Sequence, residues 1–123
     1  MAICMESKLP GRSIADWAGD AGLYHRLRDS VLELTRGAGT FGDRANYVIE
    51  RLRPIRPADF PNEMQALFLQ FQALDQEAVL HFPAGTLLRS SRLSPRKRRA
   101  FADVIFNLYE EMLKARVRGG MED

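Results

Sequence analysis

Positive charge is concentrated in one segment of this chain, residues 89–99, which reads RSSRLSPRKRR and contains six cations and no anion. The whole chain has 18 Lys and Arg residues against 16 Asp and Glu residues, and without these six cations the balance would be 12 against 16, a net charge of −4. Such a segment can bind an anionic partner through charge-assisted hydrogen bonds. The six cations, called the basic cluster below, are Arg89, Arg92, Arg96, Lys97, Arg98 and Arg99.

A helix is predicted to begin inside the basic cluster, because Ser94 can act as an N-cap and Pro95 suits the first helical position. Residues 96–99 would then fan around the first turn, about 100° apart. Cations there oppose the helix dipole, while the exposed backbone N–H groups add to the positive field and favour an anion. The alternative is that Asp75 and Glu77, at the end of an antiparallel preceding helix, pair with some of these cations and leave no ligand site.

A second candidate contact lies in residues 54–61, PIRPADFP, where three prolines in eight residues predict a stiff linker. Its apolar residues are Ile55 and Phe60. An apolar side chain that is exposed on a stiff loop can dock a partner protein, whereas one that folds back covers a helix end. Ile55 and Phe60 are candidate partner-docking residues under the first alternative.

Motifs for catalysis or metal binding are missing from the sequence. His25 and His81 stand in no HxxxH, HExxH or ExxH spacing, so no pair of helical metal ligands is predicted. The sequence contains no GxxxxGK[ST] or GxGxxG loop for phosphate. We therefore expect a non-enzymatic protein without a metal or cofactor. A third hypothesis remains, an enzyme whose site is assembled from residues distant in the sequence, because such a site leaves no local motif.

The composition is that of an ordinary globular protein. The 123 residues suit one domain, with 46% apolar and 28% charged residues. No segment approaches the roughly 20 apolar residues that span a bilayer, and the N-terminus lacks the apolar region of a secretory signal, so we expect no membrane insertion. Cys4 is the only cysteine, which excludes an intramolecular disulfide and favours a cytoplasmic setting.

Helical periodicity and capping residues predict an all-α fold, a single-domain antiparallel bundle of about four main helices with a short helical turn near the N-terminus. The short turn is expected at residues 14–18, and residues 1–12 and 119–123 are expected to fray. The third helix is apolar on more than one side, which predicts either a central position or an apolar surface for a partner. The main helices are expected to follow the N-caps Asp20, Thr40, Asp59 and Ser94 and to end near residues 36, 53, 82 and 118.

The leading functional prediction is a small helical interaction protein, of the adaptor, inhibitor or toxin-neutralising type, that binds a protein partner or a second copy of itself. It follows from the missing catalytic motifs, the apolar excess and the segregated charge. The alternative is a nucleic-acid-binding or regulatory protein that uses the basic cluster, since nucleic acid is the commonest polyanion.

Overall fold

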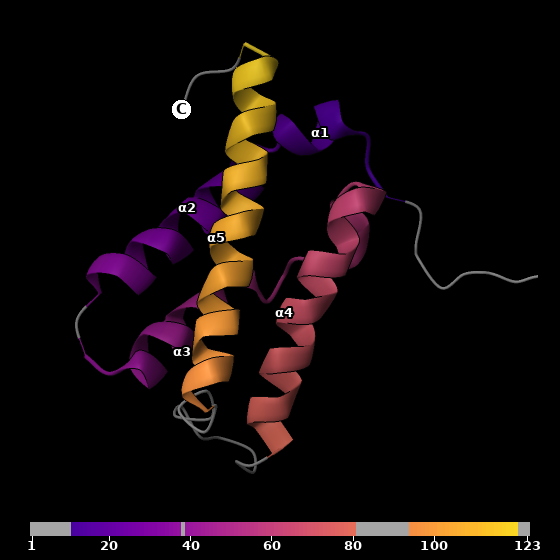
Figure 1. The fold of residues 1–123 in the computed structure, drawn as a ribbon. Coiled ribbons are helices and arrows are strands. Elements are labelled where there is room, and N and C mark those ends of the chain that lie inside the picture. The colour runs from indigo at the N-terminus through magenta and orange to yellow at the C-terminus, as the bar shows by residue number, and fades with distance from the viewer. Residues whose placement is uncertain (1–10, 38, 81–93, 121–123) are drawn as a thin grey trace, which may run out of the picture.

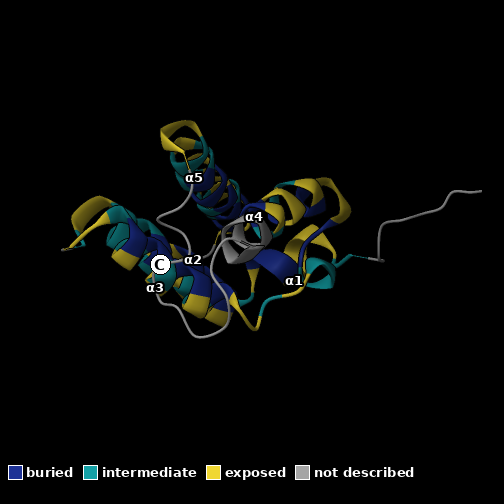
Figure 2. Cartoon of the chain, turned by 90° about the horizontal axis from the view of Figure 1, so that it is seen from below, coloured by how far each residue is buried: buried dark blue, intermediate teal, exposed yellow. Residues whose placement is uncertain are grey.

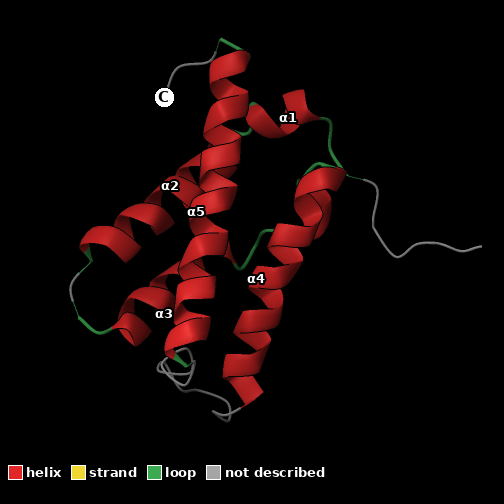
Figure 3. Cartoon of the chain, viewed as in Figure 1, coloured by secondary structure: helices red, strands yellow, loops and turns green. Residues whose placement is uncertain are grey.

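The computed structural model describes residues 11–37, 39–80 and 94–120, with side chains described up to residue 74 in the second range. Every regular element in these ranges is a helix, and none is a strand (Figure 3). The all-α prediction is therefore confirmed, with four substantial helices and a short one near the N-terminus. The elements are α1 (Ile14–Ala18), α2 (Ala21–Arg36), α3 (Phe41–Leu52), the 3-10 turn η1 (Pro57–Asp59), α4 (Asn62–Leu80) and α5 (Pro95–Arg118).

Side-chain caps begin four of the described helices, and Asp20, Thr40 and Ser94 are the predicted N-caps among them. The side-chain oxygens of Ser13, Asp20, Thr40 and Ser94 each accept the backbone N–H three residues later, at 3.0–3.3 Å. At α3 the bond is reciprocal, because the Asp43 carboxylate accepts the Thr40 N–H at 3.2 Å. These bonds satisfy donors that a helix start leaves without intrahelical partners.

The predicted N-cap at Asp59 is wrong. Asp59 ends η1 and its carboxylate accepts the backbone N–H of Arg56 at 2.8 Å, while α4 begins only at Asn62. The reason lies in Pro61, because the residue before a proline is driven out of the helical region. Phe60 is accordingly extended, with φ −113° and ψ 152°, and no helix can pass through it.

The helices form two antiparallel pairs. Figure 1 shows α4 and α5 side by side in opposite directions, with the α2–α3 hairpin inclined against α5. α5 also contacts α1, so α5, rather than the more apolar α4, is the central helix. Of the two alternatives expected for α4, the central position is wrong, because one side of the helix is exposed and carries Ala66, Leu69, Gln70 and Ala73.

The core is built around one face of α5. Residues three and four apart on α5 form a buried seam, and Figure 2 shows the buried faces of the helices turned inward. Phenylalanine rings connect this seam to the neighbouring helices. The ring centroid of Phe101 lies 5.4 Å from that of Phe71 on α4 and 5.9 Å from that of Phe41 on α3. The seam residues are Phe101, Ile105, Leu108, Met112 and Ala115.

Gly11 and Arg12 form hydrogen bonds with other parts of the fold. The backbone N–H of Arg12 donates to the carbonyl of Phe60 at 3.2 Å, and its guanidinium donates to the Asp20 carboxylate at 2.6 Å. The hydrogen bond with Asp20 raises the pKa of Arg12. Burial acts to raise the pKa of Asp20, but hydrogen bonds from the Leu23 N–H and from Arg12 outweigh it and leave the pKa below its ordinary value. Residues 1–10 and 121–123 lie outside the described residues.

No helix in the described ranges combines the length and the apolar character needed to cross a membrane.

Candidate interaction surface at the start of helix α5

Four members of the basic cluster lie together on the first turns of α5. Arg96 and Arg99 are exposed, whereas Lys97 and Arg98 are half-buried. Arg89 and Arg92 lie outside the described residues, so their part in the surface stays a prediction. The spacing along the helix thus divides the cations into an outward pair and a pair that lies against the protein.

Arg98 is positioned by an aromatic ring of another helix. Its guanidinium carbon lies 5.6 Å from the ring centroid of Phe41, the first residue of α3. Phe41 in turn packs edge-on against Phe101, one turn after Arg98. A cation over an aromatic face gains about 0.5–1 kcal/mol at an exposed site. This contact holds the start of α5 against the start of α3.

Two helix N-termini therefore meet at one end of the molecule, as Figure 1 shows for α3 and α5. Helix N-termini carry partial positive charge, which adds to the charge of the cations beside them. The Asp43 carboxylate of the α3 capping box offsets part of this field. Arg96 and Arg99 are the exposed cations at this end.

Within the described residues, no ion pair joins Arg96 or Arg99 to a carboxylate. The side chains of Asp75 and Glu77 lie outside the described part of the chain, so their pairing with the basic cluster remains an untested prediction. On α5 itself the next carboxylate is Asp103, one turn after Arg99 and exposed. The described positive surface is therefore short.

The proline-rich loop holds its two apolar residues differently. Phe60 is fully buried, and its ring stacks on Phe68 at 4.7 Å, so it covers the core and is not an exposed docking residue. The prediction that Phe60 docks a partner is therefore wrong. The ring folds back instead, because its burial removes apolar area from water. Ile55 is half-buried, packs against the core and lines a small pocket between α3 and α4.

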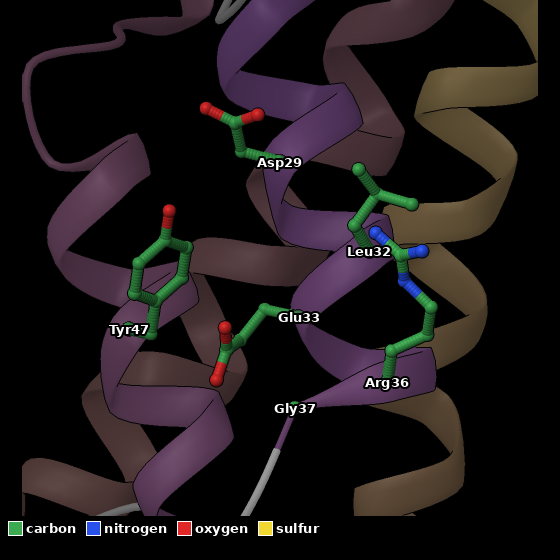
Figure 4. Close-up of a pocket in the computed structure, with 6 residues that line it drawn as sticks. All are labelled: Asp29, Leu32, Glu33, Arg36, Gly37 and Tyr47. Carbon is green, nitrogen blue, oxygen red and sulfur yellow. The ribbon is translucent and has the colours of Figure 1, made fainter.

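A second polar site, which sequence reasoning missed, is an open groove of about 410 Å³ between α2 and α3. Figure 4 shows the carboxylate of Glu33 directed toward the ring of Tyr47, whereas Arg36 reaches away from that ring. Asp29 also lines the groove, but its carboxylate is held by Arg51 at 2.5 Å. The four-residue spacing of Asp29 and Glu33 places both on one helix face and is the signal that could have indicated the groove.

The groove offers carboxylates and a phenol but leaves them open to water. Acid–base catalysis gains most from groups that converge where water is excluded. Within the described residues, no group of three His, Cys, Asp or Glu side chains is arranged to hold a metal ion. We derive no reaction from this groove.

Comparisons with protein-family models, with curated proteins and with solved structures find no match to this chain. The fold itself defines the class, an all-α helical bundle with described cations where α5 begins beside α3.

Proposed function

We propose that this chain is a small non-enzymatic binding protein that contacts an acidic segment of another protein through Arg96 and Arg99. The observation that carries the proposal is that these two arginines are exposed at a helix N-terminus and have no carboxylate partner among the described residues. Like charges held together without compensation cost stability, and an anionic partner removes that cost. The proposal places the protein in the cytoplasm, in keeping with its single cysteine.

The arrangement of the four described cations supports a protein segment as the ligand. Residues 96–99 occupy about 6 Å along the helix axis, at about 1.5 Å per residue. Nucleic-acid affinity instead grows with the number of phosphates contacted, and single strands also need aromatic rings for base stacking. The aromatic ring beside these cations is Phe41, which is half-buried under Arg98. Arg98 is held in place by that ring, which lowers the entropy lost when the cluster binds.

The test compares two double variants of equal net charge. Arg96→Ala/Arg99→Ala removes the outward pair, and Arg28→Ala/Arg118→Ala removes two exposed arginines elsewhere. Each tagged protein captures partners from a nuclease-treated extract of the organism that encodes it, and the captured protein is then purified. Its affinity is measured by calorimetry at low and high salt. We expect at least a tenfold loss for the first variant, less than a threefold change for the second, and weaker binding at high salt.

Equal binding by both variants would contradict the role of Arg96 and Arg99. Capture that succeeds from an untreated extract and fails from the nuclease-treated one would instead support the nucleic-acid alternative, which a titration with labelled DNA and RNA then quantifies. For nucleic acid the logarithm of affinity should fall linearly with the logarithm of salt concentration.

A further inference from the structure

The open groove between α2 and α3 follows the register of this antiparallel helix pair. Asp29 and Arg51 pair across the two helices at 2.5 Å. One turn along, four residues later on α2 and four earlier on α3, the residues are Glu33 and Tyr47, and both line the groove. A phenol therefore stands where the neighbouring turn has an arginine, and Glu33 faces no cation of α3 at its own level.

The other cations near the groove are directed elsewhere. Arg44, one turn before Tyr47 on α3, donates to the carbonyl of Gly39 at 2.7 Å. Arg36, three residues after Glu33, is exposed and reaches away from the Tyr47 ring in Figure 4. Within the described ranges, no ion pair or hydrogen bond reaches the Glu33 carboxylate. The groove thus contains one carboxylate that an incoming cation can bind.

Two further features add negative charge around Glu33. Its carboxylate lies over the backbone of Gly37, which ends α2, so closely that a Cβ at Gly37 would overlap it. The C-terminal end of a helix carries partial negative charge. Asp29 lies four residues earlier on the same face, and like charges at this spacing repel each other. A cation bound at Glu33 would offset both interactions.

The lining of the groove favours a guanidinium among the possible cations. A metal ion is a poor fit, because no group of three His, Cys, Asp or Glu side chains in the described part of the chain could hold one. Tyr47 is 41% exposed beside the Glu33 carboxylate, as Figure 4 shows. A guanidinium is planar, stacks on aromatic rings and bonds a carboxylate through two N–H groups, whereas an ammonium has no such plane.

The openness of the groove favours a side chain of a protein over a free small molecule. A site for a small molecule buries roughly 70–90% of the surface of its ligand. This groove, of about 410 Å³, is open to water and cannot enclose a ligand to that extent. An arginine that is part of a protein segment gains further contacts from the residues on either side of it, so it does not depend on enclosure.

We propose that the groove binds the guanidinium of an arginine side chain from a partner protein, with Glu33 as its ion-pair partner and the ring of Tyr47 as its stacking surface. This site goes beyond the function proposed above, because it takes a group of the opposite charge and uses no residue of α5. The two proposals are tested with different ligands and different variants, so either can fail alone.

The test is an NMR titration of the full-length, isotope-labelled protein with the peptide acetyl-Gly-Ala-Arg-Ala-Gly-amide. One control peptide replaces arginine with citrulline, which has the same shape without the charge, and another replaces it with lysine. We expect shifts in the ring signals of Tyr47 and the carboxyl carbon of Glu33. The arginine peptide should bind at least tenfold more tightly than the citrulline peptide and at least threefold more tightly than the lysine peptide.

Three outcomes of the titration would overturn the proposal. Absence of binding by the arginine peptide would show that the groove is not a site. Equal affinity for the lysine peptide would show that charge alone attracts the ligand. Methylguanidinium that binds as tightly as the arginine peptide would identify a site for small molecules and not for a protein segment.

Variants of the two contact residues separate the ion pair from the stacking. Glu33→Gln keeps the shape of the groove and should weaken the arginine peptide at least fivefold, whereas Glu110→Gln, at an exposed carboxylate of α5, should leave binding within a factor of two. Tyr47→Phe should keep the preference for arginine over lysine, and Tyr47→Leu should abolish it. If Glu33→Gln binds as tightly as the unchanged protein, the groove does not bind the peptide.

Discussion

The guanidinium of Arg116 donates a hydrogen bond to the backbone carbonyl of Ala18 at 2.7 Å, across 98 residues of sequence. Ala18 is the last residue of α1, where carbonyl groups lack an intrahelical partner. The same guanidinium lies 4.2 Å from the ring centroid of Tyr24 on α2. One buried side chain of α5 thus holds the junction between α1 and α2. A five-residue helix such as α1 has little stability of its own and depends on such contacts.

Replacing Arg116 should destabilise the protein more than replacing a surface arginine of the same helix. Arg116→Met keeps much of the aliphatic bulk but removes the bond to Ala18 and the contact with Tyr24. We expect a loss of about 2–3 kcal/mol in the free energy of unfolding, measured by urea denaturation. Arg118→Met, at an exposed position, should change it by less than about 0.5 kcal/mol. Similar losses in the two variants would show that the Ala18 contact is not significant for stability.

The Arg12–Asp20 ion pair should make stability depend on acid pH. Because the folded-state pKa of Asp20 is lowered, its contribution is fully present above the unfolded value near 3.8 and is lost as pH falls through the folded value. Asp20→Asn can still cap α2 but cannot pair with Arg12. The variant should be less stable near neutral pH and should lose less stability between about pH 4 and pH 2.

Urea denaturation followed by circular dichroism at several pH values measures this difference. Asp103→Asn, at an exposed carboxylate of α5, serves as the control and should follow the unchanged protein. Parallel pH profiles for the Asp20 variant and the unchanged protein would contradict the assignment.

Two glycine-to-alanine substitutions should have opposite effects. A Cβ at Gly11 would lie 2.3 Å from the carbonyl oxygen of Phe60, so alanine must displace the segment that carries Arg12. At Gly22, inside α2, a Cβ meets nothing nearer than 3.4 Å. Gly11→Ala should lower the free energy of unfolding by about 1–2 kcal/mol, and Gly22→Ala should raise it by about 0.5–1 kcal/mol. Thermal denaturation of both variants tests the sign, and a stabilised Gly11 variant would be inconsistent with the close approach.

Arg98 and Phe41 should be energetically coupled. A double-mutant cycle with Arg98→Met and Phe41→Leu should give a coupling free energy of about 0.5–1 kcal/mol in urea denaturation. The same cycle with Arg99→Met, whose side chain is exposed, should give a value near zero. Equal coupling in the two cycles would mean that general charge effects, rather than the ring contact, link α3 to α5.

The sequence by itself determined the features that depend on near neighbours. The caps at Asp20, Thr40 and Ser94 were predicted correctly, because a side-chain oxygen and an N–H three residues later meet wherever the helix forms. The buried seam of α5 was predictable for the same reason, since helical spacing alone puts its residues on one face.

Prediction from the sequence failed where two local preferences conflicted. It also failed where a contact joins residues that are far apart in the sequence. At Asp59 the capping pattern was outweighed by Pro61, which keeps Phe60 extended. Arg116 is a cation in the last turn of α5, and no local pattern marks it as buried; the packing of α1 and α2 against α5 buries it. No spacing along the chain indicates which helices will meet.

The basic cluster could be predicted from the sequence only in part. The sequence located the basic cluster and placed residues 96–99 around one helix turn, because charge and helix geometry are local properties. Only the tertiary structure brought Phe41 under Arg98 and formed the small pocket between the end of α3 and the middle of α4. The physical reason is that a pocket is the space between elements, and that space is determined by how side chains from distant parts of the chain pack together.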